Sequence, residues 1–231
     1  MKYADYIKQI EIDSLWEGRK HIVWTLDPRV NILSGVNGGG KSTILLRTMK
    51  GAKGVHAGEI PGIHVTTEPQ DAEYVRFDVV TMPEVRSDFD LNLQTLLDRY
   101  DAFEHDEQQQ QRLFDTIDRL FHETEKHVDR SQKKLTLVQW GKDLDMHVLS
   151  NGEKQMLTIL LTVYMEGQQS YVLFMDEPEV SLHVEWQKEL IDIILHLNPN
   201  VQIILTTHSP AVIMNGWIDK VTEVSEIEVK E

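Results

Sequence analysis

Hydrophobic positions in the first fifty residues fall into short runs separated by polar turns. The runs at Ile7–Ile12 and His21–Leu26 predict two strands joined by a turn, which would form an antiparallel edge. Val30–Leu33 predicts a third strand that leads into a glycine-rich loop. The spacing in Ser42–Lys50 predicts a helix, and we expect it to end at Gly51.

The middle of the chain is more polar. Residues 51–72 are rich in Gly, Pro and His and predict a loop, and Tyr74–Thr81 predicts a strand. Residues 83–90 look irregular, whereas Leu91–Arg130 has apolar positions at helical spacing. We therefore expect a small helical lobe at approximately residues 84–134, inserted after the glycine-rich loop.

The last part of the chain returns to alternating helices and apolar strands. Helices are predicted at Asn151–Glu166 and Ser181–Leu197, and strands at Tyr171–Met175, Val201–Thr206 and Lys220–Val224. Strands with uninterrupted apolar character are typical of parallel sheets covered on both faces. The sequence thus predicts an α/β fold with a mainly parallel central sheet and an antiparallel N-terminal edge.

Composition narrows the class of protein. The chain has 231 residues, 41% hydrophobic and 26% charged, which fits one soluble globular domain over residues 1–231. It has no cysteine, no secretory signal pattern and no apolar run of bilayer length, so we expect a cytoplasmic protein without membrane insertion. The net charge of −15 does not support nucleic acid as a partner, although Arg47, Lys50 and Lys53 leave a local basic patch open.

The glycine-rich loop matches the pattern of a phosphate-binding loop, G-x-x-x-x-G-K-[ST], with a strand before it and a helix after it. Glycines let the backbone fold around a triphosphate, and the helix directs its positive end at the phosphates. We expect Lys41 to reach the β- and γ-phosphates of ATP and the Ser42 hydroxyl to bind Mg²⁺. The candidate nucleotide ligands are Gly35, Asn37, Gly38, Gly39, Gly40, Lys41, Ser42 and Thr43.

Two carboxylates and a histidine follow apolar strands further along. Asp176 and Glu177 end the strand at Tyr171–Met175; Asp176 is expected to hold Mg²⁺, and Glu177 to activate the attacking water. His208 follows the next apolar strand, where it could contact the γ-phosphate. The candidate catalytic residues are Lys41, Glu177 and His208.

The segment Leu149-Ser150-Asn151-Gly152-Glu153 allows two interpretations. Ser150 and Glu153 have the spacing of a capping box at the start of a helix. The segment also resembles the signature motif of ABC ATPases, in which Ser150 and the Gly152 amide would touch a γ-phosphate. The two interpretations are compatible, because a helix N-terminus is also an anion site.

These motifs, in this order, resemble the ABC-type ATPase superfamily with its P-loop fold. Asp176-Glu177-Pro178-Glu179 with Leu182-His183 is similar to the RecF/Rad50/OLD-like AAA_21 group, here as a stand-alone head without a long coiled coil. The resemblance implies a homodimer that closes head-to-tail around ATP and Mg²⁺, so that Ser150 and Gly152 face the other copy's phosphates. It also implies ATP hydrolysis that drives or gates a separate effector, such as a nuclease or toxin-like protein, in DNA surveillance, repair or anti-phage defence.

Alternatives remain at this point. The total length also suits the ATP-binding subunit of an ABC membrane transporter, and a repair ATPase that binds DNA directly is a third possibility. The glutamine that family members place after the strand at Tyr74–Thr81 is not evident, and Gln94 and Gln70 are candidates. Trp16 or Trp24 could stack on adenine; we take Trp16 as the candidate.

Overall fold

The computed structural model describes residues 1–16, 18–57, 60–81 and 86–229. These residues form two compact units built from alternating segments of the chain. Unit 1 contains residues 1–81, 169–178 and 200–231, and unit 2 contains residues 82–168 and 179–199. In the described residues no helix combines the length and apolarity that a bilayer crossing needs.

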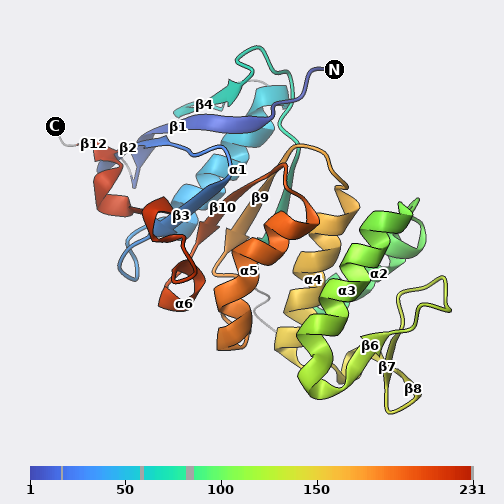
Figure 1. Ribbon diagram of the computed structural model, residues 1–231. Coiled ribbons are helices and arrows are strands. Elements are labelled where there is room, and N and C mark those ends of the chain that lie inside the picture. Colours follow the sequence, from blue (N-terminus) through green and yellow to red (C-terminus); the bar gives the residue numbers. More distant parts are fainter. Residues whose placement is uncertain (17, 58–59, 82–85, 230–231) are drawn as a thin grey trace. The chain divides into compact units, whose positions relative to one another are not determined.

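Unit 1 contains a five-stranded, all-parallel sheet in the order β11-β3-β10-β9-β5 (Figure 1). Every residue of β10 and all but the last of β9 are buried, as expected for strands covered on both faces. The strands are β3 (Val30–Ser34), β5 (Phe77–Thr81), β9 (Tyr171–Asp176), β10 (Val201–Thr206) and β11 (Val221–Glu223). The predicted α/β fold with a parallel sheet is confirmed.

The antiparallel strands of unit 1 form a second sheet in the order β12-β2-β1-β4, rather than an edge of the parallel sheet. They are β1 (Tyr6–Leu15), β2 (Lys20–Thr25), β4 (Ile63–Glu68) and β12 (Glu228–Val229). One hydrophobic core joins the inner face of this sheet, α1 (Lys41–Ala57) and the parallel strands. A short helix, α6 (Pro210–Ile213), follows β10.

Two predictions around α1 were wrong. The helix continues to Ala57 instead of ending before Gly51, and residues 63–68 form β4 instead of loop. A Cβ at Gly51 would lie 2.6 Å from a methyl carbon of Val65 and 2.8 Å from one of Ile63. The glycine therefore lets the helix approach the sheet closely and does not end it.

Unit 2 contains four helices and a small antiparallel sheet, β6-β7-β8. The helices are α2 (Arg86–Asp101), α3 (Glu107–Phe121), α4 (Asn151–Met165) and α5 (Val184–Leu197), and the strands are β6 (Lys126–Val128), β7 (Leu137–Gln139) and β8 (Lys142–Leu144). The expected helical lobe thus also includes β6. Residues 86–90 are helical rather than irregular, whereas 82–85 lie outside the described residues.

Candidate functional site

The phosphate-binding-loop pattern connects β3 to α1, as its sequence context predicts. Gly38 and Gly40 have φ of 74° and 99°, which side chains other than glycine rarely adopt. Lys41 is only 4% exposed, and its Nζ donates to the carbonyl oxygens of Gly35 at 3.1 Å and Val36 at 3.3 Å. The lysine ammonium is therefore held by the loop itself.

The two candidate tryptophans differ in position. A Cβ at Gly40 would lie 2.7 Å and 2.8 Å from two ring carbons of Trp16, so the indole lies against the loop. Trp16 is 39% exposed, whereas Trp24 is 2% exposed and belongs to the hydrophobic core. Only Trp16 is therefore available to a ligand at the loop.

Asp176, at the end of β9, is fixed from two sides. The Ser42 hydroxyl donates to Asp176 Oδ1 at 3.0 Å, and the Thr206 hydroxyl donates to the same atom at 2.5 Å. Thr206 reaches it because β10 pairs in parallel with β9 and Thr206 lies opposite Asp176. A hydroxyl beside a carboxylate supplies the hard oxygen ligands that Mg²⁺ prefers, so these two residues fit that ion.

Glu177 follows in a left-handed conformation, with φ of 47°. Its amide donates to the carbonyl oxygen of Thr206 at 3.2 Å and to the Thr206 hydroxyl at 3.1 Å. Its Oε1 lies 3.3 Å from His208 Nε2. Thr206 thus holds the carboxylate of Asp176 and the backbone amide of Glu177. We did not infer this function from the sequence, because its position at the strand end was the only signal.

A pocket of about 720 Å³ in unit 1 brings most of these residues together. Its described lining consists of Trp16, Asn37, Gly38, Gly40, Lys41, Ser42, Thr43, Glu177 and His208. Gly35 lines an adjacent pocket of about 380 Å³. Asp176 is not among the described lining residues, but it accepts a hydrogen bond from Ser42, which is. The volume is in the range of small-molecule sites.

The segment that resembles a signature motif lies in unit 2, at the start of α4. The Ser150 hydroxyl accepts from the Glu153 amide at 3.2 Å, and Glu153 Oε2 accepts from the Ser150 amide at 2.9 Å. The predicted capping box is therefore present. Burial opposes ionisation of Glu153, but hydrogen bonds from Lys126 and Ser150 outweigh it and hold its pKa below the ordinary value.

Gly152 lies against the segment that follows Glu179. A Cβ at Gly152 would be 2.5 Å from the carbonyl oxygen of Ser181, so an alanine there requires backbone movement. His183 accepts from the Glu185 amide and caps α5. A pocket of about 700 Å³ in unit 2 is lined by residues from both segments, among them Ser150, Asn151, Gly152, Ser181, His183 and Trp186.

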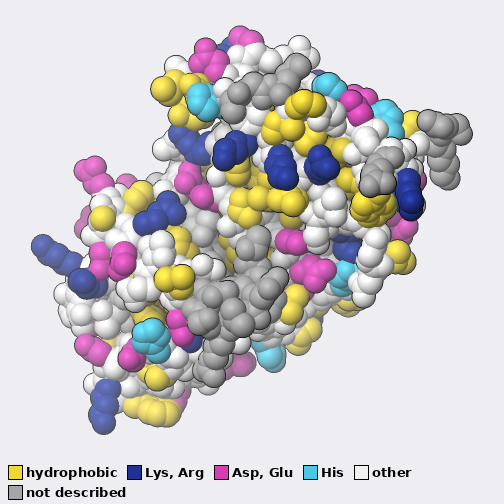
Figure 2. All heavy atoms as spheres, turned by 180° about the vertical axis from the view of Figure 1, so that it is seen from behind, with side chains coloured by type: hydrophobic (Ala, Val, Ile, Leu, Met, Phe, Trp, Pro, Cys, Tyr) yellow, Lys and Arg dark blue, Asp and Glu magenta, His cyan; other side chains and the backbone are white. Residues whose placement is uncertain are grey.

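Several sequence candidates lie outside both pockets. Gln70 lies in the turn after β4, and Gln94 lies on α2, where it donates to Asp98. Residues 82–85, which follow β5, are outside the described part of the chain. Figure 2 shows a row of Lys and Arg side chains beside hydrophobic ones on one face; Lys50 and Lys53 are exposed on α1.

Comparison with known proteins identifies relatives by sequence. Residues 68–215 match the AAA_21 family, described as "AAA domain, putative AbiEii toxin, Type IV TA system". A retron Vc95 probable ATPase from Vibrio cholerae serotype O1 biovar El Tor is 25% identical over 107 residues, covering 42% of this chain and 21% of that protein. Septu protein PtuA from Bacillus thuringiensis is 39% identical over 49 residues, 21% of this chain and 12% of that protein. The chain thus matches only about a fifth or less of the length of these relatives.

Solved structures show the same fold at low identity. An SMC head bound to the C-terminal winged-helix domain of ScpA has a TM-score of 0.58 at 14% identity, and covers 91% of this chain and 92% of its own. The SMC head domain from Thermotoga maritima has a TM-score of 0.56 at 15% identity, with 94% of each chain covered. The fold is therefore that of P-loop ATPase heads of the ABC type. Because the family match extends over more than half of its length, this chain belongs to the AAA_21 family of ATPases.

Proposed function

We propose that the pocket in unit 1 binds ATP and hydrolyses it to ADP and phosphate. The observation that carries the proposal is the convergence of the phosphate-binding loop, Trp16, Glu177 and His208 on one pocket. Lys41, already held by the loop carbonyls, would exchange these contacts for the β- and γ-phosphates. Trp16 lies where it could stack on the adenine ring.

Ser42 and Asp176 would hold Mg²⁺, which supplies charge neutralisation of the phosphate oxygens when bound. Glu177 would accept the proton of the attacking water, and His208, 3.3 Å from its carboxylate, would hold Glu177 in place and contact the γ-phosphate. Thr206 would hold the Asp176 carboxylate and the backbone of Glu177 through its hydroxyl. Catalysis would then come from protein groups that hold the ATP and the attacking water in position for phosphoryl transfer.

We further propose that two copies form a head-to-tail dimer around ATP. Ser150 and the Gly152 amide, at the N-terminus of α4, have the donors and the helix dipole that a γ-phosphate needs. They line a pocket of their own in unit 2. In the dimer this pocket would face the phosphate-binding loop of the other copy, so each ATP would be bound by two chains.

The names of the relatives support a role in anti-phage defence. One is a retron ATPase and the other a Septu protein. We propose that ATP-driven dimerisation gates a separate effector, a nuclease or toxin-like protein. With a net charge of −15, the chain itself is poorly suited to attract nucleic acid. A role in DNA surveillance or repair is compatible with this proposal, because the effector protein would be the one that acts on DNA.

Steady-state ATP turnover and nucleotide binding, measured on the same protein preparations, test the pocket. Glu177→Gln should keep ATP affinity and slow hydrolysis by at least about 10²-fold, because the general base is lost. Lys41→Ala should instead abolish binding. Glu185→Gln, which removes an exposed carboxylate paired with Lys188, is the matched control and should change neither quantity. Parental turnover in Glu177→Gln, or unchanged affinity in Lys41→Ala, would contradict the proposal.

A further inference from the structure

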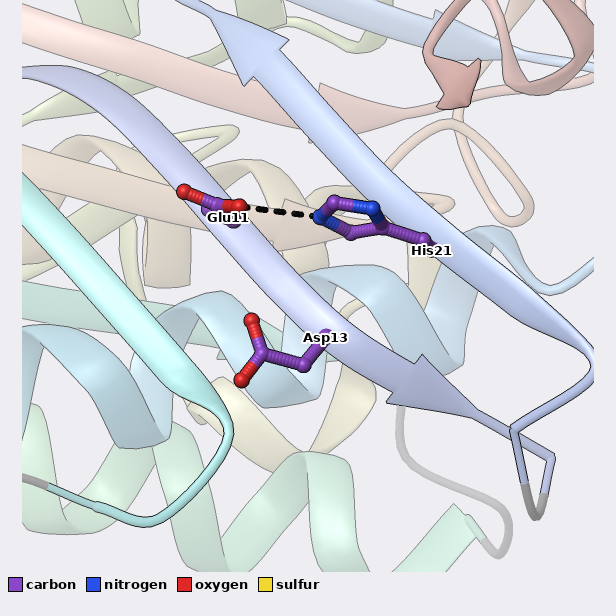
Figure 3. Close-up of side chains that lie close together, drawn as sticks. All are labelled: Glu11, Asp13 and His21. Carbon is purple, nitrogen blue, oxygen red and sulfur yellow. Dashed lines mark hydrogen bonds and ion pairs between the residues drawn. The ribbon is translucent and has the colours of Figure 1, made fainter. Parts of the chain in front are cut away.

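Three side chains with metal-ligating atoms gather on the antiparallel sheet of unit 1, on strands β1 and β2. Glu11 and Asp13 come from β1 and His21 comes from β2, and Figure 3 shows them on neighbouring strands. Each offers one ligand atom, and the three atoms lie within 4.8 Å of one another. His21 Nε2 is 2.9 Å from Glu11 Oε1.

The strand pattern explains why they meet. Ile10, Ile12 and Ile22 are fully buried, so their neighbours in sequence point to the opposite face. Ile12 pairs with Ile22 across the strands, which brings the neighbouring His21 to the part of β1 that carries Glu11 and Asp13.

A second imidazole lies on the other side of β1. His64 of β4 pairs with Glu11 in register, and its Nε2 lies 3.4 Å from Asp13 Oδ2. Two histidines and two carboxylates from three adjacent strands thus share one face. The side chains of Asp13 and His64 are about half exposed, at 50% and 51%, so the face is accessible to ions.

We propose that Glu11, Asp13 and His21 bind one divalent transition-metal ion of the Zn²⁺ class, with His64 or water as the fourth ligand. Zinc–nitrogen and zinc–oxygen distances are about 2.0–2.2 Å, so ligand atoms on one ion lie at most about 4.4 Å apart. The observed spread of up to 4.8 Å exceeds this size, so metal binding would draw the side chains together. Imidazole favours zinc, copper, iron or nickel over Mg²⁺.

The charge of the cluster favours a dication. Glu11 and Asp13 bring two carboxylates to neighbouring positions on one strand face, and a dication would compensate their charge. Binding of the metal would replace the two cross-strand contacts, His21 with Glu11 and His64 with Asp13.

The site has a structural consequence for the nucleotide pocket, and this part rests on the proposed function. The turn after β1 carries Trp16, which lies against Gly40 of the phosphate-binding loop. An ion held by both β1 and β2 would cross-link the hairpin just before this turn. Metal binding would then restrict the movement of Trp16.

Titration of the full chain with Co²⁺ alone, followed by its visible absorption, tests the site. Excess Mg²⁺ is kept in the buffer to compete with Co²⁺ for oxygen-ligand sites, such as the one proposed at Ser42 and Asp176. We expect one Co²⁺ per chain, displaced by Zn²⁺, and affinity at least about 10-fold lower in Asp13→Asn and in His21→Gln. His127→Gln, at an exposed histidine on β6, is the control and should bind as the parent does.

Three outcomes would overturn the proposal. One is the absence of a Co²⁺ band in the parent chain, which would leave only cross-strand ion pairs. Another is equal affinity in the parent, Asp13→Asn and His21→Gln, provided that circular dichroism shows all three folded. The third is loss of the band in His208→Gln with retention in His21→Gln, which would place the ion in the nucleotide pocket. Because the Co²⁺ band is read without ATP, failure here leaves the proposed ATPase untouched.

Discussion

The contact between Gly40 and Trp16 shows how a single residue shapes the pocket. Gly40 has a positive φ of 99°, and a Cβ there would be 2.7 Å from the indole. Gly38 also has a positive φ of 74°, but a Cβ there would meet nothing within 4 Å. A substitution at Gly38 would therefore introduce backbone strain alone, whereas one at Gly40 would introduce backbone strain and a clash with Trp16.

Gly40→Ala should lower the free energy of unfolding by about 1–3 kcal/mol, the range for a residue forced into a rare conformation. Part of the loss should come from the clash with Trp16, so Trp16→Ala in the same chain should reduce it. Urea denaturation of the parent, both single variants and the double variant measures the coupling.

The control for this cycle is Gly38→Ala with and without Trp16→Ala. These two changes should add within about 0.5 kcal/mol, as expected for residues without a shared contact. Additivity in the Gly40 cycle as well would contradict a role for the contact.

At the residue scale, the sequence predicted the phosphate-binding loop but not the side chains that pack against it or orient its neighbours. Lys41 and Ser42, which the G-x-x-x-x-G-K-[ST] pattern singled out, line the pocket in unit 1. The sequence favoured Trp16, in the predicted turn, over Trp24, in a predicted strand, but it could not show that the Trp16 ring lies against Gly40. Nor could it show that Thr206 links Asp176 and Glu177, since strand pairing brings together residues about thirty positions apart.

At the element scale, the start of α4 is stabilised by a network of charges. Glu153 is 4% exposed, and its carboxylate accepts from Ser150 and forms an ion pair with Lys126 at 2.6 Å. The Thr124 hydroxyl also donates to it, at 3.3 Å. The network ties the N-terminus of α4 to the 3₁₀ turn at His122–Thr124 and to β6.

This network predicts a pH dependence of stability. Because the folded chain holds the pKa of Glu153 below its ordinary value, the unfolded chain binds more protons in that pH range. The contribution of Glu153 is therefore fully present above about pH 4.5 and is lost as the pH falls through the lower, folded-state pKa. Glu153→Gln should lower the free energy of unfolding at neutral pH and flatten its acid dependence.

Thermal or urea unfolding between pH 3 and pH 7 measures this dependence. Glu104→Gln, at an exposed carboxylate outside the network, is the matched control and should keep the parental slope. The same slope in Glu153→Gln as in the parent would mean that the network does not stabilise α4.

Long elements with clear periodicity were predictable, and those decided by distant contacts were not. The helix at α4 and the strands β9 and β10 agree closely with their predicted ranges. Gly51 was misread as a helix end because glycine has the same local signal when it permits a close approach to Ile63 and Val65. The three-residue strands β6, β7 and β8 are too short to give a periodic pattern.

At the scale of the whole molecule, the two pockets divide between the two units. Unit 1 contains the phosphate-binding loop with Glu177 and His208, and unit 2 contains Ser150 and Gly152. If two copies complete each other's pockets, then two variants that are each inactive for a different reason should regain ATP turnover when they are mixed. This gives the dimer proposal a test that does not depend on a structure of the complex.

Ser150→Arg should block hydrolysis without lowering the nucleotide affinity of the monomer, and Lys41→Ala should fail to bind nucleotide. If the proposed dimer forms, mixing these variants should give heterodimers in which one pocket has an intact loop and an intact Ser150. ATP turnover in the mixture should therefore exceed the sum of the separate activities.

Ser150→Ala controls for the loss of the helix cap, which costs about 1 kcal/mol of stability without adding bulk. It should retain more activity than Ser150→Arg. Full activity of Ser150→Arg alone, or no gain on mixing, would contradict the head-to-tail dimer.

The proposed effector protein would bind the assembled dimer, so its test also belongs to the scale of the whole molecule. Tagged Glu177→Gln, which should remain in the ATP-bound dimer, can be isolated from its native cell with ATP present and analysed by mass spectrometry. We expect a nuclease or toxin-like protein in excess over the amount that Lys41→Ala retains. A multi-span membrane protein would instead support a transporter subunit and contradict the proposed effector.

The parallel pairing of β3 with β10 and β11 has a consequence for synthesis of the chain. β3 leads directly into the phosphate-binding loop, yet its neighbours begin at Val201 and Val221. At typical translation rates, the roughly 170 residues between β3 and β10 take on the order of ten seconds or more to make. During that interval β3 has neither of its neighbouring strands, so we expect the proposed nucleotide pocket to be completed late in translation, after β10 has been made.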